Sequence, residues 1–284
     1  METFTLANGV KMPKLGYGVY QVSPDEAERC VLDAIDVGYR LIDTAQFYMN
    51  ESGVGQAVKK CGVPREELFI TTKTWIQDNG YEKAKAAIER SLQNLQMDYI
   101  DLMLIHQPYG DIYGTWRAYE EAYEAGKIRA ISVSNFYPDR LIDLCAFCRI
   151  KPMVNQVETH VFFQQKIGHQ YMEKYGVKHQ CWAPFAEGEN GIFTHPVLAD
   201  IGAKYGKSNA QVALRFLLQK DVMVIPKSVR KERMVENANV FDFELSAEDI
   251  ARMEELDTGK SLFHEHVDPR NVEWFVFRNQ ECMK

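Results

Sequence analysis

The stretch DVGYRLIDTAQFYMNESGVGQAVKK, residues 36–60, predicts a strand, a loop and a helix in succession. A mostly apolar run ends on Asp43, the loop that follows carries Tyr48, and Asn50 opens a helical segment. A carboxylate at the tip of a strand that leaves a core needs a partner or a chemical role, because an unpaired buried charge is costly. The next two predicted strands supply candidates for that partner.

Both of these strands end on ionisable side chains. The run FITTKTW is apolar or β-branched up to Lys73, and the run IDLMLIHQP is almost wholly apolar up to His106. Because the carboxyl ends of neighbouring parallel strands lie at one edge of a sheet, these side chains should lie close together. We therefore expect Asp43, Lys73 and His106 to form one site with the loop residue Tyr48.

The rest of the chain repeats the alternation of strand and helix. A hairpin is predicted over residues 3–12, where alternating apolar residues flank Asn8-Gly9. Strands are predicted at 14–20, 39–43, 68–73, 100–106, 129–134, 153–157, 178–183 and 222–226. Helices are predicted at 24–38, 50–60, 81–95, 114–125, from Pro138, at 164–175 and at 208–220, with two more at 231–240 and 247–256, and the tail 257–284 shows no clear period. Alternating strands and helices predict a parallel sheet.

The number of strand–helix units distinguishes between two parallel-sheet folds. Eight units within 284 residues match a closed (β/α)8 TIM barrel. An open doubly wound sheet would carry G-x-G-x-x-G after its first strand, and Gly16-Tyr17-Gly18 lacks the third glycine. We predict an α/β fold, a single (β/α)8 TIM barrel domain over residues 1–284, with an N-terminal β-hairpin and two extra helices.

Charge and composition exclude several classes of partner. The formal charge of −7 and the pI of about 5.6 argue against a nucleic-acid partner, which requires a basic face. No run approaches the roughly 18 apolar residues of a membrane span, and METFTLANG lacks the features of a secretory signal. Six cysteines in such a chain are expected to be reduced thiols. We expect a cytoplasmic monomer that contacts neither nucleic acid nor membrane.

The four strand-end and loop residues suggest acid–base chemistry on a carbonyl. Tyrosine has an ordinary pKa of about 10, and a buried ammonium such as Lys73 is expected to lower it. Asp43 would keep that lysine charged, and Tyr48 could then protonate an oxygen that gains negative charge. His106 would hydrogen-bond and orient the same oxygen. The substrate would be a carbonyl compound or an alcohol, and a cofactor would have to supply the hydride.

Other chemistries lack their motifs. The chain has no G-x-S-x-G for acyl transfer and no H-E-x-x-H for zinc. Cys145 and Cys148 form a C-x-x-C without a second ligand pair, so we interpret them as core residues of a helix. We interpret the cluster His264-Glu265-His266 as part of a solvated loop in the aperiodic tail. No metal site is expected.

A second cluster suggests where a phosphate binds. The last predicted strand runs into IPKSVRKERMVEN, residues 225–237, where basic side chains and Ser228 gather at the start of a helix. A helix N-terminus with cations and a hydroxyl is suited to phosphate, because backbone N–H groups and positive charge converge there. In an acidic protein this local density of cations favours a phosphate site over an ordinary basic helix face.

Three stretches make the chain recognisable, namely DTAQFYMNE (43–51), LMLIHQP (102–108) and IPKSVRKERMVEN (225–237). From Gly16 to about Leu256 the chain resembles the aldo-keto reductase family. The resemblance implies an NADPH-dependent reductase of aldehydes and ketones, with hydride transfer from nicotinamide C4. It also implies a catalytic tetrad of Asp43, Tyr48, Lys73 and His106, with Tyr48 as the general acid.

The same resemblance implies which residues contact NADP(H). Ser134, Asn135 and Gln156 would hold the nicotinamide carboxamide, and Trp182 would stack on the ring. The 2′-phosphate would lie against Lys227, Ser228 and Arg233, and the adenine against Glu236 and Asn237. The loop from Pro184 to Gly191 would cover the pyrophosphate, and the other implied cofactor residues are Gly18, Val19, Tyr20, Phe185 and Val229.

The substrate pocket is less defined. Its predicted residues are Tyr20, Phe47, Trp75, Gln107 and Tyr109, and for Tyr20 and Trp75 packing at the barrel mouth is the alternative. Gln107 stands where many family members have tryptophan, and Thr159 where an aromatic residue is common. Within the family, the stretch WAPFAEG (182–188) and the short tail resemble bacterial reductases of the 2,5-diketogluconate or methylglyoxal type.

Two alternatives to a reductase remain open from the sequence. One is a cofactor-binding redox sensor or regulatory protein with little turnover, which a complete tetrad disfavours. The other is an isomerase or aldolase in which Lys73 forms a Schiff base, and a neighbouring Asp43 that keeps the lysine protonated disfavours it.

Overall fold

A computed structural model describes residues 2–277 and confirms the predicted barrel. Eight parallel strands follow one another in chain order around the sheet. The main-chain N–H groups of Gly16 and Gly18 then donate to the carbonyl oxygens of Val224 and Pro226, at 2.9 and 3.2 Å, which joins the two edges of the sheet. The strands are β3 (Tyr17–Gly18), β4 (Leu41–Asp43), β5 (Phe69–Thr74), β6 (Leu102–Ile105), β7 (Ile131–Ser134), β8 (Val154–Glu158), β9 (Lys178–Trp182) and β10 (Met223–Val224).

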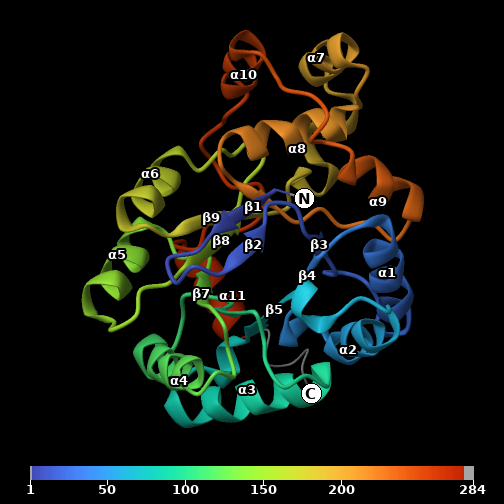
Figure 1. Cartoon of the computed structure of the whole chain (residues 1–284). Coiled ribbons are helices and arrows are strands. Elements are labelled where there is room, and N and C mark those ends of the chain that lie inside the picture. The colour runs from blue at the N-terminus through green and yellow to red at the C-terminus, as the bar shows by residue number, and fades with distance from the viewer. Residues whose placement is uncertain (1, 278–284) are drawn as a thin grey trace.

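Helices surround the strands, as Figure 1 shows along the barrel axis. The α-helices are α1 (Pro24–Val37), α2 (Glu51–Lys60), α3 (Tyr81–Leu95), α4 (Ile112–Glu124), α5 (Pro138–Phe147), α6 (Lys166–Tyr175), α7 (Pro196–Tyr205), α8 (Asn209–Gln219), α9 (Lys231–Ala238), α10 (Ala247–Glu254) and α11 (Pro269–Phe277). Short 3-10 helices are η1 (Gln46–Tyr48), η2 (Arg65–Glu67), η3 (Ile76–Asp78) and η4 (Ala186–Thr194). The main hydrophobic core fills the layer between strands and helices.

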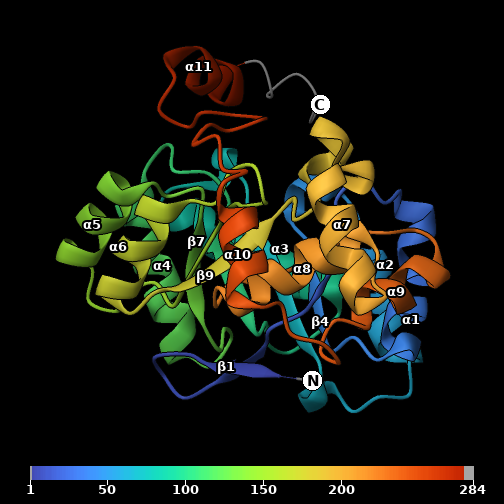
Figure 2. The ribbon, with the colours of Figure 1, turned by 90° about the horizontal axis from the view of Figure 1, so that it is seen from above.

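The two ends of the barrel are covered differently, as Figure 2 shows from the side. The predicted hairpin, β1 (Thr3–Thr5) paired with β2 (Lys11–Pro13), covers the end where the strands begin. Its side chains Phe4 and Met12 pack with Leu41 and Phe69 in a second apolar cluster inside the barrel. Helix α11 lies at the opposite end, above the carboxyl ends of the strands. The hairpin therefore leaves the carboxyl end free to hold the site.

Two glycines, Gly16 and Gly18, lie at the seam of the barrel. A Cβ atom on Gly16 would lie 2.3 Å from Cδ2 of Leu41, which is closer than atoms can approach. A side chain at this position would therefore displace Leu41 of β4. At Gly18 a Cβ atom would lie 3.1 Å from the carbonyl oxygen of Ile225, so the close approach of β3 to the residue after β10 favours glycine there. The Gly16-Tyr17-Gly18 segment that argued against an open sheet is thus part of the closure.

Two helices were not predicted. Helix α7 has ordinary signals, with Pro196 at its first turn, Gly206 after its end and Leu198 and Ile201 on its buried face. Helix α11 shows no clear period because its apolar residues lie on several faces, with Phe275 buried and Phe277 exposed. The predictions for 231–240 and 247–256 correspond to α9 and α10.

Two other findings concern membrane-spanning helices and the cysteines. Within residues 2–277, no helix is long and apolar enough to cross a membrane. In the same range, the five cysteines are free, and Cys145 and Cys148 lie in or directly after α5 as predicted. The sixth, Cys282, lies outside the described residues.

A buried histidine in the barrel wall makes stability depend on pH. The ring of His179 hydrogen-bonds Thr159 at 2.8 Å and the ring of His169 at 3.0 Å, and burial lowers its pKa to about 3. The unfolded chain gains a proton at this residue below a pH of about 6.5, while the folded chain does not. The free energy of unfolding should therefore fall as the pH drops below that value.

We expect His179→Gln to weaken this dependence. Between about pH 7.5 and about pH 5.5, the variant should lose about 1 kcal/mol less stability than the original protein. Urea unfolding at both pH values measures the difference. An equal loss in both proteins would show that another group carries the pH dependence.

Candidate active site

The four predicted catalytic residues lie together at the carboxyl end of the barrel. Asp43 is the last residue of β4, Lys73 lies one residue before the end of β5, and His106 directly follows β6. These three strands are neighbours in the sheet, so their ends are adjacent. Tyr48 reaches the same place from η1, the short turn that follows β4.

Lys73 connects Asp43 to Tyr48. Its Nζ atom donates to Oδ1 of Asp43 at 2.5 Å, to the carbonyl oxygen of Thr44 at 2.9 Å and to the phenol oxygen of Tyr48 at 3.3 Å. The lysine side chain is fully buried. These three bonds use all three ammonium hydrogens, so no free amine remains to attack a carbonyl carbon.

Asp43 is held from its other side as well. Its Oδ2 atom accepts from Nε2 of Gln156 at 2.8 Å, and the same amide donates to Gln180 at 2.9 Å. Both carboxylate oxygens therefore have a partner, which is what a buried carboxylate requires. The pairing also joins β4 to β8 across the interior of the barrel.

The expected effect of Lys73 on the pKa of Tyr48 is wrong. Burial raises the pKa of Tyr48 well above its ordinary value, and the charge of Asp43 adds to the rise. The ammonium and the carboxylate form one pair, so much of the field of the lysine at the phenol is cancelled by the aspartate. Burial lowers the pKa of Lys73, and its pairing with Asp43 opposes that change. Tyr48 therefore holds its proton firmly in the free site.

His106 is a neutral imidazole in this environment. Burial lowers its pKa well below the ordinary value, and the charges of Lys73 and of a protonated His266 act in the same direction. Its ring stands edge-on to Tyr48, with centroids 5.7 Å apart. A neutral ring can donate one hydrogen bond, but it holds no spare proton to transfer at neutral pH.

These residues open into a cavity of about 470 Å³. Predicted residues in its wall are Gly18, Tyr20, Asp43, Phe47, Tyr48, Trp75, His106, Gln107, Ser134, Asn135, Gln156, Trp182, Pro184, Phe185 and Lys227. Residues that sequence reasoning missed are Gln21, Ala183, Phe193, Ile225, Phe263, His264, His266, Trp274 and Phe275, while Glu187 and Gly188 belong to the predicted loop from Pro184 to Gly191. Most of the missed residues come from the segment after β9 and from the tail.

The predicted nicotinamide residues form one connected wall. Asn135 has a left-handed backbone, with φ of 63°, and its side chain donates to the carbonyl oxygen of His106 at 3.0 Å. The indole N–H of Trp182 donates to Oδ1 of Asn135 at 2.8 Å. The hydroxyl of Ser134 donates to the carbonyl oxygen of Gln156 at 2.7 Å. A strained residue held by such bonds is typical of a functional site.

Basic side chains lie around the last strand end as predicted. Lys227 and Arg233 are exposed, and neither forms an ion pair or a side-chain hydrogen bond within the described part of the chain. Lys231 differs, because its Nζ atom lies 2.5 Å from the carboxylate of Asp36. Ser228 is buried at the start of this segment, where its hydroxyl accepts from the backbone N–H of Arg230 at 3.1 Å.

The other predicted cofactor residues do not line the cavity. Val19 and Asn237 are buried, Val229 is half-buried, and Glu236 accepts a hydrogen bond from the hydroxyl of Ser208. Glu236 would have to release Ser208 to contact an adenine, or accept from both. These assignments stay predictions.

Of the five predicted substrate-pocket residues, all but Tyr109 line the cavity. Trp75 is almost fully buried and stacks on Phe47, with centroids 4.1 Å apart and an interplanar angle of 21°. Tyr20 is exposed, and its ring packs against that of Tyr48, with centroids 5.1 Å apart. Tyr109 lies behind the cavity, where its hydroxyl donates to the carbonyl oxygen of His266 at 2.9 Å. Tyr109 therefore supports the tail from behind the cavity, and its assignment to the substrate pocket stays a prediction.

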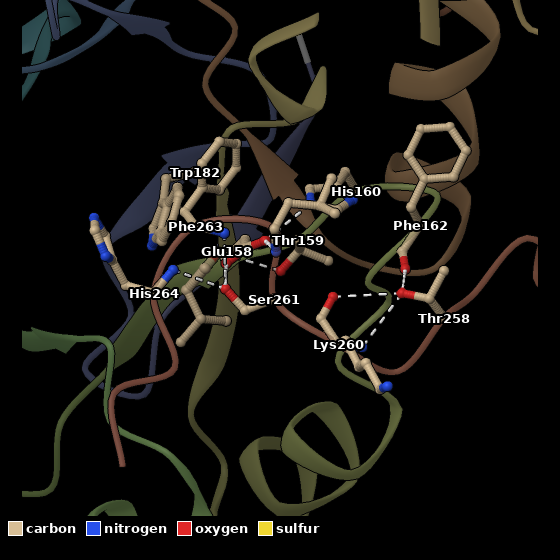
Figure 3. A network of polar contacts seen from close by, with 12 residues as sticks. Glu158, Thr159, His160, Phe162, Trp182, Thr258, Lys260, Ser261, Phe263 and His264 are labelled. Atoms are coloured by element: carbon tan, nitrogen blue, oxygen red, sulfur yellow. Dashed lines mark hydrogen bonds and ion pairs between the residues drawn. The ribbon is translucent and has the colours of Figure 1, made fainter. Parts of the chain in front are cut away.

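The tail is attached to the barrel by Glu158, the last residue of β8 (Figure 3). The carboxylate accepts from the hydroxyl of Ser261 at 2.5 Å and from the N–H of Leu262 at 2.9 Å. It also contacts the ring of His160 at 3.0 Å. These bonds place Phe263 against Trp182 at the cavity, with centroids 5.7 Å apart.

The prediction of a solvated loop at His264-Glu265-His266 is wrong. His264 and His266 line the cavity, and His266 is buried. Their rings stack on aromatic rings of α11, His264 on Trp274 and His266 on Phe275. Helix α11, which was not predicted, thus supplies a stacking partner for each of the two histidines.

Comparison with known proteins agrees with this geometry. The family model described as "Aldo/keto reductase family" matches residues 5–258. The chain belongs to the aldo/keto reductase family. It is 50% identical to the glyoxal reductase of Bacillus subtilis over 258 residues, which cover 90% of this chain and 93% of that protein. It is 41% identical to methylglyoxal reductase DkgA of Escherichia coli K12, covering 90% of this chain and 94% of that protein.

A solved structure shows the same fold in this family. The Bombyx mori aldo-keto reductase in complex with NADP superposes with a TM-score of 0.88 at 32% identity, covering 96% of each chain. The predicted family is thus confirmed, and the oxidoreductase class with it.

Proposed function

We propose that this aldo/keto reductase reduces small aldehydes and ketones to alcohols with NADPH, using Tyr48 as the general acid. The observation that carries the proposal is the hydrogen-bonded chain Asp43–Lys73–Tyr48, which runs from buried residues to a cavity that also holds His106. Such a chain has one free polar end, the phenol, and that end faces the space where a carbonyl would bind.

Tyr48 and His106, the two groups at the proposed substrate position, differ in whether they carry a proton that they can transfer. Tyr48 keeps its proton because its pKa is raised, whereas His106 is neutral because its pKa is lowered. An alkoxide is a stronger base than a phenolate, so a carbonyl oxygen that becomes an alkoxide can take the phenol proton. The role left for His106 is to donate a hydrogen bond that holds this oxygen in position.

Lys73 stabilises the phenolate that remains. Its ammonium already lies 3.3 Å from the phenol oxygen, so no rearrangement is needed when charge appears there. Asp43 and Gln156 fix the lysine in turn. The Schiff-base alternative is disfavoured, because Lys73 is fully buried and its three hydrogens are in use.

The side chains in the cavity wall and at the start of α9 fit an NADP(H) molecule. Among residues 2–277, Lys227 and Arg233 have no ion-pair partner, and they lie near the start of α9, which suits a phosphate monoester. Amide groups of Asn135 and Gln156 and the ring of Trp182 line the cavity near the tetrad, which suits a carboxamide and a flat ring. Bound NADPH would supply the hydride. The solved Bombyx mori relative in complex with NADP supports this choice.

The substrate class follows from the size of the cavity and from the relatives. A cavity of about 470 Å³ that also receives a nicotinamide leaves room for a small carbonyl compound. The glyoxal and methylglyoxal reductases to which the chain is similar make dicarbonyls the first substrates to try.

NADPH oxidation, followed by absorbance, tests the proposal. The panel is methylglyoxal, phenylglyoxal, a simple aldehyde and a keto sugar acid. We expect turnover with at least one of them. Tight NADPH binding without turnover on any would contradict the proposal and support a cofactor-binding sensor instead.

A mutation at Arg233 tests the phosphate site. Arg233→Ala should weaken NADPH binding by about 10- to 100-fold, because a charge-assisted hydrogen bond to phosphate is lost. NADH has no 2′-phosphate, so its binding should change little. Fluorescence titration with both cofactors measures the two dissociation constants.

Lys231→Ala is the matched control. It removes one positive charge from the same helix, but Lys231 is paired with Asp36 on the surface. We expect the NADPH to NADH preference of this variant to be unchanged. Equal weakening of both cofactors in Arg233→Ala would refute the assignment of the 2′-phosphate to this arginine.

A further inference from the structure

A buried imidazole in the cavity wall has ring nitrogens without hydrogen-bond partners in the described part of the chain. His266 is only 6% exposed, it lines the cavity, and neither of its ring nitrogens has a hydrogen-bond partner of normal geometry within residues 2–277. A buried nitrogen without a partner costs free energy. Such a group in the wall of a binding cavity points to a ligand that satisfies it.

The position of the His266 ring is fixed by its surroundings. One face stacks on Phe275, with an interplanar angle of 16°, and the ring of Tyr137 stands edge-on to it, with centroids 5.6 Å apart. The carbonyl oxygen of His266 accepts from Tyr109, and that of Glu265 accepts from Asn271. The segment before it is held at Ser261 by Glu158 (Figure 3). The ring is thus presented to the cavity, not free to turn into solvent.

A chain of ring contacts connects His266 to the reacting groups. The rings of His106 and Trp75 are 5.0 Å apart, and those of Trp75 and Phe275 are 6.3 Å apart. Phe275 is in turn 5.8 Å from His266. The indole nitrogen of Trp75 and the amide oxygen of Gln107 are also buried without partners. A ligand group that enters between these rings meets several unsatisfied polar atoms.

The imidazole of His266 is suited to an uncharged oxygen. Burial and the neighbouring His264 lower its pKa to about 3, so the ring is neutral at physiological pH. Tyr137 is uncharged, and burial lowers the pKa values of His264 and His106, so none of these neighbours brings a positive charge. A neutral N–H can donate to a carbonyl or hydroxyl oxygen, while a carboxylate would be desolvated here without a cation.

We propose that His266 selects substrates with a second, uncharged oxygen on the carbon next to the reduced carbonyl, by donating a hydrogen bond to that oxygen. α-Oxoaldehydes and α-hydroxyaldehydes have this pattern. The inference rests on the proposed reduction in the same cavity. It concerns a residue beyond the match to the family model, which ends at residue 258.

The test compares methylglyoxal with propanal, which differ by this one oxygen. In His266→Phe, kcat/KM for methylglyoxal should fall about tenfold, as the loss of one hydrogen bond predicts. The value for propanal should change by less than about twofold, because the phenylalanine ring keeps the stacking on Phe275. Hydration of the aldehydes is the same for both enzymes and cancels when each substrate is compared with itself.

Two further variants separate hydrogen bonding from packing. His266→Asn restores an N–H group, so its preference for methylglyoxal should recover most of the loss. His195→Phe makes the same change at a histidine outside the cavity whose Nδ1 atom is also buried without a partner, and it should leave both kcat/KM values unchanged.

The outcomes distinguish this inference from the proposed function. Active His266→Phe enzyme with an unchanged ratio of the two kcat/KM values overturns the role of His266 and leaves the reductase intact. An equal loss for both substrates, not recovered by His266→Asn, also overturns it and assigns a packing role. If the original protein reduces neither aldehyde, it is the proposed function that fails.

Discussion

Replacing Tyr48 with phenylalanine should lower kcat for carbonyl reduction by about 1,000-fold or more, the contribution expected of a general acid. The variant keeps the ring and its packing against Tyr20 and His106, and it loses only the hydroxyl. No other group in the cavity can replace it, because His106 is neutral and Lys73 is already bonded to Asp43 and Thr44. NADPH binding should stay within about twofold of the original value.

Stopped-flow measurement of NADPH oxidation and a fluorescence titration give the two quantities. The control is Tyr81→Phe, which also removes one phenol hydroxyl, at a surface site where it bonds Glu121. That variant should have normal kcat. Turnover retained in Tyr48→Phe would refute the acid role, and loss of NADPH binding together with turnover would show that the change had damaged the whole site.

Lys73→Met should reduce both activity and stability. The phenolate that forms at Tyr48 would lose its nearby positive charge, and we expect kcat to fall by about 100-fold or more. Asp43, 1% exposed, would then be a buried carboxylate without its cation. Removal of one partner of such a pair costs about 3–5 kcal/mol of unfolding free energy.

The double variant Asp43→Asn/Lys73→Met separates the two effects. The buried charge is gone from both positions, so much of the stability should return, whereas kcat should stay low. Urea unfolding and steady-state kinetics of the single and double variants measure this. A Lys73→Met protein as stable as the original would mean that Asp43 takes up a proton or that water reaches it.

The catalytic group was predictable because it depends on chain order. Asp43, Lys73 and His106 end consecutive strands, and consecutive strands of a parallel barrel are neighbours. The helix caps and the turn at Asn8-Gly9 are also local signals, and they placed most elements within a few residues of the structure. The catalytic and cofactor roles of these residues remain predictions.

The electrostatics of the site could not be read in the same way. The pKa of Tyr48 depends on how completely the phenol is buried and on where the charge of Asp43 lies relative to that of Lys73. The sequence identifies the charged residues but not the distances between them, so the direction of the pKa shift of Tyr48 was predicted wrongly. Burial outweighs a cation that is itself neutralised.

The structure of the tail could not be predicted either, because it depends on contacts with distant parts of the chain. Residues 257–277 show no clear period. Ser261 bonds Glu158, Phe263 packs on Trp182, and the carbonyl oxygen of His266 accepts from Tyr109. The burial of His266 follows from that packing.

Local periodicity, turn residues and strand order were enough to specify the barrel and to bring the tetrad to its carboxyl end, since these properties act between neighbours in the chain. The tertiary structure alone decided which protons the site holds and which side chains close over it. Those properties depend on burial and on contacts between segments far apart in sequence, and such contacts exist only once the chain has folded.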